Sequence, residues 1–157
     1  MADEDVPLHT ELRRFGPIGD RELTIVTGAD GTPSSMNACR QAFVLAARQS
    51  AAVTAVYAAD HPPIDLLGSG IDVEHEAQAA TFAELTEDIR ALAEEHAVPA
   101  TFALVHGDAA TVLAETADQC GADIVVVGRS THIGHRIVGA VGARLARVGH
   151  WPVLIVP

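Results

Sequence analysis

The sequence predicts an α/β fold: one doubly wound sheet of five parallel strands with helices on both faces. Five short apolar runs rich in β-branched residues alternate with stretches of helical periodicity along the 157 residues, which is the pattern of strands joined by crossover helices. Hydrophobic residues make up 48% of the chain but aromatic residues only 4%. The core is therefore expected to consist of Val, Ile, Leu and Ala, as in helices packed on a parallel sheet.

One domain is expected over residues 21–157, because the length fits the usual range of about 100–200 residues per domain. Residues 1–20 mix acidic residues, prolines and an arginine pair without sustained periodicity, so we expect a tail that lies on the surface or is disordered. The elements expected after this tail are a strand at 23–29, a helix at 33–50, a strand at 51–58, a helix at 73–97, a strand at 100–106, a helix at 109–120, a strand at 123–128, a helix at 139–149 and a strand at 151–156.

The predicted helices have recognisable ends and faces. Thr32 is expected to be the N-cap of the first helix with Pro33 in its first turn, Asp108 to cap the third helix, and Gly149 to end the last. In the helix at 73–97, side chains that recur at three- and four-residue steps are expected to face the sheet. These are Phe82, Leu85, Ile89, Leu92 and His96.

The charge balance excludes several classes of partner. The formal net charge is −11, and all ten basic residues are arginines, so we expect neither nucleic acid nor a membrane surface as a partner. The lack of lysine also excludes a phosphate-binding loop of the G-x-x-x-x-G-K-[ST] type. Cys39 and Cys120 are isolated, and we expect both to be small core residues of a cytoplasmic protein. No apolar run is long enough to span a membrane.

Three polar or glycine positions follow predicted strands, where open α/β sheets bind ligands. Asp30 follows the first strand, Gly107 the third and Gly128 the fourth. In the strand order 3-2-1-4-5 expected for this fold, the first and fourth strands are neighbours, so Asp30 and Gly128 are expected to lie close together. A structural interpretation stays open, because Asp-Gly suits a turn without any ligand and Asp108 after Gly107 suits a helix N-cap.

These segments together resemble the universal stress protein family. The resemblance is carried by Leu23-Thr-Ile-Val-Thr-Gly-Ala-Asp30-Gly-Thr-Pro-Ser-Ser35, by His106-Gly107-Asp108, and by the stretch from Asp123 to Gly142. It implies a small α/β protein of a family in which some members bind ATP and others do not. By this resemblance Asp30 corresponds to the aspartate that accepts hydrogen bonds from the adenine and ribose region, and Gly107 to a turn near the nucleotide.

The loop after the fourth strand departs from the ATP-binding members of that family. Their pattern is Gly, two residues, Gly, nine residues, then Gly and Ser or Thr, so that backbone N–H groups and a hydroxyl hold the phosphates. Gly128 fits the first glycine and Gly139 the third, but Thr131 replaces the second glycine and Ala140 replaces the hydroxyl residue. Arg129 and Ser130 are expected to offer alternative phosphate donors.

The last strand, 151–156, is strongly apolar and is expected at an edge of the sheet, where it invites pairing with another chain. The family resemblance also implies a homodimer through this strand. We therefore expect a dimeric cytoplasmic stress-response or regulatory module that acts mainly through an unidentified protein partner, is not an enzyme and needs no cofactor. The alternative is a sensor that binds ATP or AMP.

Other residues carry weaker signals. His132, His135 and His150 are expected to be exposed histidines and not metal ligands, because no cysteine or carboxylate with ligand spacing accompanies them. Residues 60–72 are too rich in proline and glycine for regular structure. Whether they form a lid over a ligand or a variable surface loop stays open.

Overall fold

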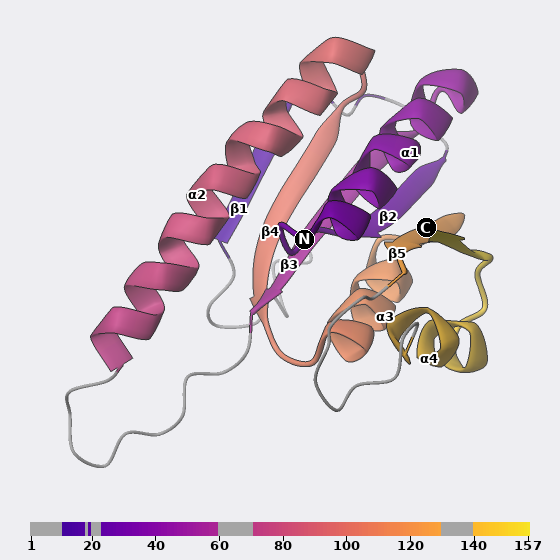
Figure 1. Cartoon of the computed structure of the whole chain (residues 1–157). Helices are drawn as coiled ribbons and strands as arrows, with labels where there is room; N and C mark the ends of the chain where they lie inside the picture. Colours follow the sequence, from indigo (N-terminus) through magenta and orange to yellow (C-terminus); the bar gives the residue numbers. More distant parts are fainter. Residues whose placement is uncertain (1–10, 18, 20–22, 60–70, 130–139) are drawn as a thin grey trace, which may run out of the picture.

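A six-stranded sheet with helices on both faces forms the protein in the computed structural model (Figure 1), which describes residues 11–17, 19, 23–59, 71–129 and 140–157. The strand order is β1-β4-β3-β2-β5-β6. The strands are β1 (Glu11–Phe15), β2 (Thr24–Gly28), β3 (Ala52–Ala59), β4 (Ala100–His106), β5 (Ile124–Gly128) and β6 (Val153–Val156). The helices are α1 (Pro33–Gln49), α2 (Ile71–His96), α3 (Ala109–Gln119) and α4 (Ala140–Val148).

The predicted parallel sheet is confirmed for strands β2 to β6, whose order β4-β3-β2-β5-β6 is the expected 3-2-1-4-5. The prediction of only five strands was wrong. β1 adds a sixth strand, antiparallel to β4, with Glu11 opposite Leu104 and Phe15 opposite Ala100. It falls within residues 1–20, which were expected to be a tail.

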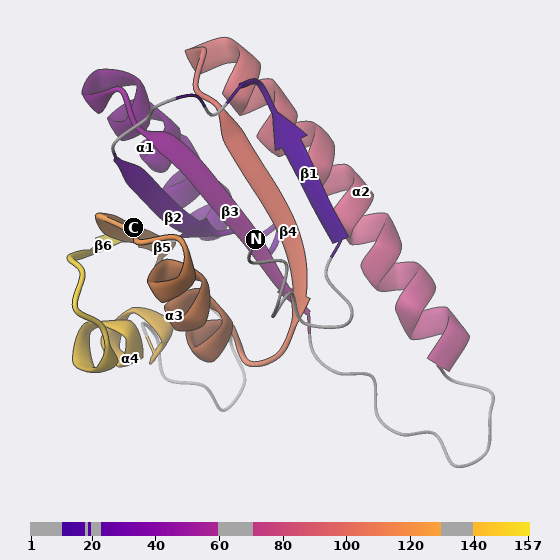
Figure 2. The same cartoon turned by 180° about the vertical axis from the view of Figure 1, so that it is seen from behind.

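The sequence analysis did not predict β1, because only two of its five residues are apolar. Its place is fixed by contacts that are distant in sequence: Phe15 packs against the core, and the Arg13 guanidinium lies 5.4 Å from the centre of the Phe82 ring on α2. A cation over an aromatic face is a favourable contact. The edge of the sheet thus acquires a short charged strand (Figure 2).

Two separate cores lie on the two faces of the sheet. Helices α1 and α2 cover one face, and α3 and α4 cover the other (Figures 1 and 2). Both cores consist mainly of Val, Ile, Leu and Ala with few rings, as the composition predicts. Phe43 and Phe102 are the largest fully buried side chains, and both belong to the α1 and α2 side.

The predicted helix signals are confirmed. The Thr32 hydroxyl accepts a hydrogen bond from the Ser35 N–H at 3.3 Å, and the Asp108 carboxylate accepts one from the Thr111 N–H at 3.1 Å. Gly149 follows the last turn of α4 and donates its N–H to the Leu145 carbonyl. On α2 the expected apolar residues are buried: Phe82, Leu85, Ile89 and Leu92.

Backbone hydrogen bonds bring the carboxyl ends of the strands to one edge of the sheet. The N–H groups of Ala29, Gly107 and Arg129 donate to the carbonyls of Val56, Ala59 and Val156, at 2.8, 2.9 and 2.7 Å. The turns that carry the candidate site residues therefore begin side by side. Within the described part of the chain, no helix is long and apolar enough to cross a membrane.

Candidate functional site at the carboxyl edge of the sheet

Asp30 lies in the turn between β2 and α1 and is exposed. Its Oδ1 accepts hydrogen bonds from the Thr32 N–H at 2.9 Å and from the Thr32 hydroxyl at 2.7 Å. The Asp30 carboxylate therefore stabilises the turn, as expected from the interpretation that Asp-Gly forms a turn without any ligand. Among the described residues no hydrogen bond reaches Oδ2, so this oxygen is available to accept from a ligand.

Ser35 completes the fixation of Asp30. Its Oγ accepts a hydrogen bond from the Asp30 N–H at 2.9 Å and donates to the Gly28 carbonyl at 3.3 Å, and its own N–H donates to Thr32. Ser35 is buried. Backbone and side chain of Asp30 are thus both held by the first turn of α1. The sequence analysis did not single out Ser35, although serine side chains commonly form hydrogen bonds with nearby backbone groups at turns and helix starts.

Gly128 lies directly beside this turn, as expected from the pairing of β2 with β5. A Cβ atom at Gly128 would lie 2.5 Å from the carbonyl carbon and oxygen of Ser34 and 2.7 Å from the nitrogen of Ser35. Contacts this short with backbone atoms do not occur, so the first turn of α1 crosses the end of β5 only because residue 128 has no side chain. The structure brings Asp30 and Gly128 together through this contact.

The remaining predicted residues of the loop after β5 are only partly described. Arg129 is exposed, and its N–H binds the Val156 carbonyl. Ser130 and Gly139 lie outside the described residues, as do Thr131, His132 and His135. Ala140 is the first residue of α4 and is half-buried.

Gly107 begins the turn after β4 with a φ of +146°, a conformation that favours glycine. A Cβ there would also lie 2.9 Å from a methyl group of Val112. The next residue, Asp108, caps α3 as the structural interpretation expects. The conformation of Gly107 is thus explained by the turn itself.

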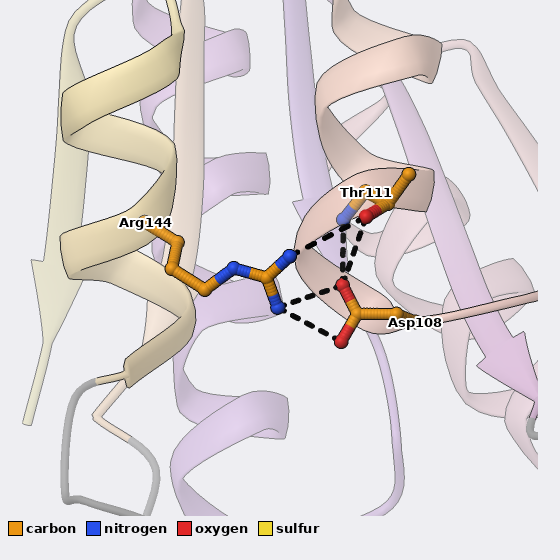
Figure 3. A network of polar contacts seen from close by, with 3 residues as sticks. All are labelled: Asp108, Thr111 and Arg144. Carbon is orange, nitrogen blue, oxygen red and sulfur yellow. Dashed lines mark hydrogen bonds and ion pairs between the residues drawn. The ribbon is translucent and has the colours of Figure 1, made fainter.

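A polar network at the same edge joins α3 to α4 (Figure 3). Arg144 of α4 reaches across to the first turn of α3, where its Nη1 lies 2.9 Å from Oδ1 and 2.8 Å from Oδ2 of Asp108. Its Nη2 makes a longer contact of 3.4 Å with the Thr111 hydroxyl, which donates to Asp108 at 3.0 Å. The hydrogen bond from Arg144 is the main cause that lowers the pKa of Asp108 below its ordinary value. Residues 108 and 144 are too far apart in sequence for this pairing to be predicted.

The cysteines do not contribute to this site. Cys39 is buried in the core beside Thr27, and burial raises the pKa of its thiol to about 12. The prediction of a core position is confirmed for Cys39 but is wrong for Cys120, which is exposed at the end of α3. Within the described residues, no cluster of three or more His, Cys, Asp or Glu side chains is placed to hold a metal ion.

The strand order defines the class of doubly wound α/β proteins, and the order reverses between β2 and β5. Within this class the chain belongs to the universal stress protein family, whose sequence profile matches residues 23–157. β1 precedes the matched region.

Individual relatives agree with this assignment. A universal stress protein of Methanocaldococcus jannaschii is 29% identical over 136 residues, which cover 84% of this chain and 80% of the relative. A universal stress protein solved in complex with cAMP is 28% identical, with a TM-score of 0.68 over 86% of this chain and 97% of that one. UspA of Lactobacillus plantarum is 21% identical and has the same fold, with a TM-score of 0.70 over 87% and 99% of the two chains.

Proposed function

We propose that this protein is a dimeric cytoplasmic regulatory module that binds an adenine nucleotide at the carboxyl edge of its sheet. The observation that carries the proposal is the Asp30 turn. Thr32 and Ser35 fix the aspartate, while Oδ2 has no partner among the described residues. A fixed carboxylate binds a hydroxyl or amino group with little further loss of conformational freedom.

The comparison with the cAMP complex supports an adenine nucleotide as the ligand, because that protein is 28% identical over most of both chains. In this proposal Oδ2 of Asp30 accepts hydrogen bonds from the ribose or adenine end. The phosphates extend toward Arg129 and the start of α4, where the helix dipole favours negative charge. Arg129 donates hydrogen bonds to the phosphates in place of the hydroxyl group that Ala140 lacks.

A second candidate is a protein-interaction module that needs no nucleotide. It is favoured by the contact between Gly128 and the first turn of α1, because this contact requires glycine whether or not a ligand binds. The turn at Asp30 and the cap at Asp108 are likewise explained without a ligand. The two candidates differ in whether Oδ2 of Asp30 has a binding partner.

The proposed dimer interface is the free edge of β6. The carbonyls of Pro152 and Val156 accept hydrogen bonds from the N–H groups of Val125 in β5 and of Arg129 directly after it. Since backbone groups alternate in direction along a strand, those of Val153 and Ile155 point away from the sheet. β6 contains no charged residue, and the side chains of Leu154 and Ile155 are 38% and 44% exposed. An apolar edge of this kind is suited to pairing with a second copy.

The nucleotide proposal is tested by titration calorimetry with AMP, cAMP and Mg-ATP on the wild type and on Asp30→Asn. Asparagine keeps an oxygen for Thr32 and so preserves the turn, but it replaces the second oxygen by an amino group, which cannot accept. We expect saturable binding by the wild type and a loss of about tenfold or more in the variant. A melting curve of the variant checks that its fold is intact.

Two outcomes contradict the proposal. Absence of heat and of any melting shift with all three nucleotides leaves the interaction module as the function. Equal affinity of the wild type and Asp30→Asn means that nucleotide binds elsewhere. We also propose that the protein binds nucleotide without rapid turnover, and a phosphate-release assay on the same samples tests this.

A further inference from the structure

Arg144 is the residue of the carboxyl edge whose role neither the fold nor the family match explains. Among the described residues its guanidinium is half engaged: Nη1 contacts both oxygens of Asp108, whereas Nη2 makes a single contact there, at 3.4 Å with Thr111 (Figure 3). The Arg144 and Asp108 side chains are 52% and 48% exposed. An ion pair exposed to this degree contributes little to stability, so a more strongly charged anion is able to displace Asp108.

A phosphate is such an anion. It offers more charge than a carboxylate, and the guanidinium binds it through two parallel hydrogen bonds. Exchange of Asp108 for a phosphate oxygen would also give Nη2 a short contact in place of the long one with Thr111. The exchange therefore improves the contacts of Arg144 and releases only a weak pair.

The position of Arg144 places it near the phosphates of the proposed nucleotide. It follows Ala140, the first residue of α4, by four residues, so both lie on one face of the helix, and helical side chains lean toward the N-terminus. Its partner Asp108 directly follows Gly107 at the carboxyl end of β4. Arg144 thus joins the first turns of α4 to the start of α3 at the carboxyl edge of the sheet.

We propose that Arg144 leaves Asp108 and binds the distal phosphates of a nucleoside triphosphate. Arg144 in this way senses the number of phosphates on the nucleotide. The exchange breaks the polar link between α3 and α4, so that a triphosphate changes this helix contact and a monophosphate leaves it intact. This inference rests on the proposed nucleotide binding and adds the residue that distinguishes ATP from AMP.

Arg144 and Asp108 have opposite roles in this mechanism, because Arg144 binds the phosphate and Asp108 competes with the phosphate for Arg144. Variants of the two residues therefore test the proposal. Arg144→Gln removes the phosphate ligand. Asp108→Asn removes the competing charge and leaves Arg144 free to bind, while asparagine still caps α3. A merely structural link between α3 and α4 would make both variants change affinity in the same direction.

The experiment measures the dissociation constants of Mg-ATP and AMP for the wild type, Arg144→Gln, Asp108→Asn and Arg147→Gln. The last is the matched control, an exposed arginine in the last turn of the same helix. We expect Arg144→Gln to weaken ATP binding about tenfold and AMP binding less than about twofold. Asp108→Asn is expected to tighten ATP binding by about twofold to fivefold, and Arg147→Gln to leave both constants unchanged.

The inference is overturned if Arg144→Gln binds ATP as the wild type does, if it loses AMP and ATP equally, or if Asp108→Asn weakens ATP binding as Arg144→Gln does. In these cases nucleotide binding by the wild type still stands as the function. If the wild type binds neither nucleotide, the proposed function fails and this inference fails with it.

Discussion

The two edges of the sheet expose the same backbone groups but are protected in different ways. At the β1 edge, Glu11, Arg13 and Phe15 lie opposite the β4 residues whose backbone N–H and C=O groups point toward β1. The backbone N–H and C=O groups of Leu12 and Arg14 therefore point away from the sheet. At the other edge the groups of Val153 and Ile155 do so. Each edge therefore offers two residues for pairing with another chain.

The side chains make the difference. β1 carries Glu11, Arg13 and Arg14 among its five residues, whereas β6 carries only apolar ones. Charged residues on an edge strand discourage pairing with other chains. The β1 edge is thus protected from pairing by its charged side chains, whereas the β6 edge has no charged side chain to discourage pairing. In the proposed dimer, β6 of a second copy closes it.

The largest effect is expected from placing a charged side chain on β6, as β1 already has. Ile155→Arg places a charge at the proposed interface, and burying it there without a partner is costly. We expect the dissociation constant of the dimer to rise by about a hundredfold or more, measured by sedimentation equilibrium. Leu12→Arg on β1, at a residue that is also 45% exposed, is the matched control and is expected to leave association unchanged. Equal effects of the two variants, or a wild type that is monomeric, would contradict the difference between the edges.

A smaller effect is expected from weakening the attachment of β1. Phe15 packs against the core on the α2 side, whereas Leu12 is exposed on the opposite face of the strand. Phe15→Ala is expected to lower the free energy of unfolding by about 1–3 kcal/mol, because the side chain is only partly buried. Leu12→Ala is expected to change it by less than about 0.5 kcal/mol. Urea unfolding measures both, and similar losses would mean that β1 is not held by its α2 face.

The same contrast explains how much of the fold the sequence predicts. β6 and the other parallel strands are continuous apolar runs such as Ile124–Gly128 and Val153–Val156, a signal that lies within the segment itself. β1 has no such run. It forms because β4 offers a free edge and because Phe82, almost seventy residues away, offers a ring to Arg13. A contact between distant residues leaves no mark in local periodicity.

The candidate site divides in the same way. The placement of Asp30 and Gly128 side by side follows from the strand order, and the caps at Thr32 and Asp108 follow from local residue types. The Asp108–Arg144 pair does not, because it depends on how α3 and α4 pack. The sequence analysis also took Gly128 as a phosphate-binding position, whereas the structure gives it a packing reason in the contact with α1.

The smallest expected effect concerns how the two edges are attached to their helices. On the β1 side, the contact of Phe15 with the core involves no titrating group, so acid leaves it unchanged. The β6 side depends on α4, which Arg144 joins to Asp108 of α3. Arg144 lowers the pKa of Asp108 in the folded protein below its unfolded value near 3.8. The stabilisation is therefore fully present above pH 3.8 and is lost as the pH falls below it, through the folded pKa.

Asp108→Asn removes this titration but keeps the N-cap. Urea unfolding at about pH 5, 4 and 3, a range that spans the ordinary pKa of an aspartate, is expected to show a wild-type advantage in the free energy of unfolding that shrinks with acid. Because the pair is half exposed, the whole advantage stays below about 1 kcal/mol. Phe15→Ala, the control on the β1 edge, is expected to lower the free energy of unfolding by a similar amount at every pH, because its contact with the core is apolar. A wild-type advantage over Asp108→Asn that stays constant down to the lowest pH would mean that the link between α3 and α4 is not an ion pair in solution.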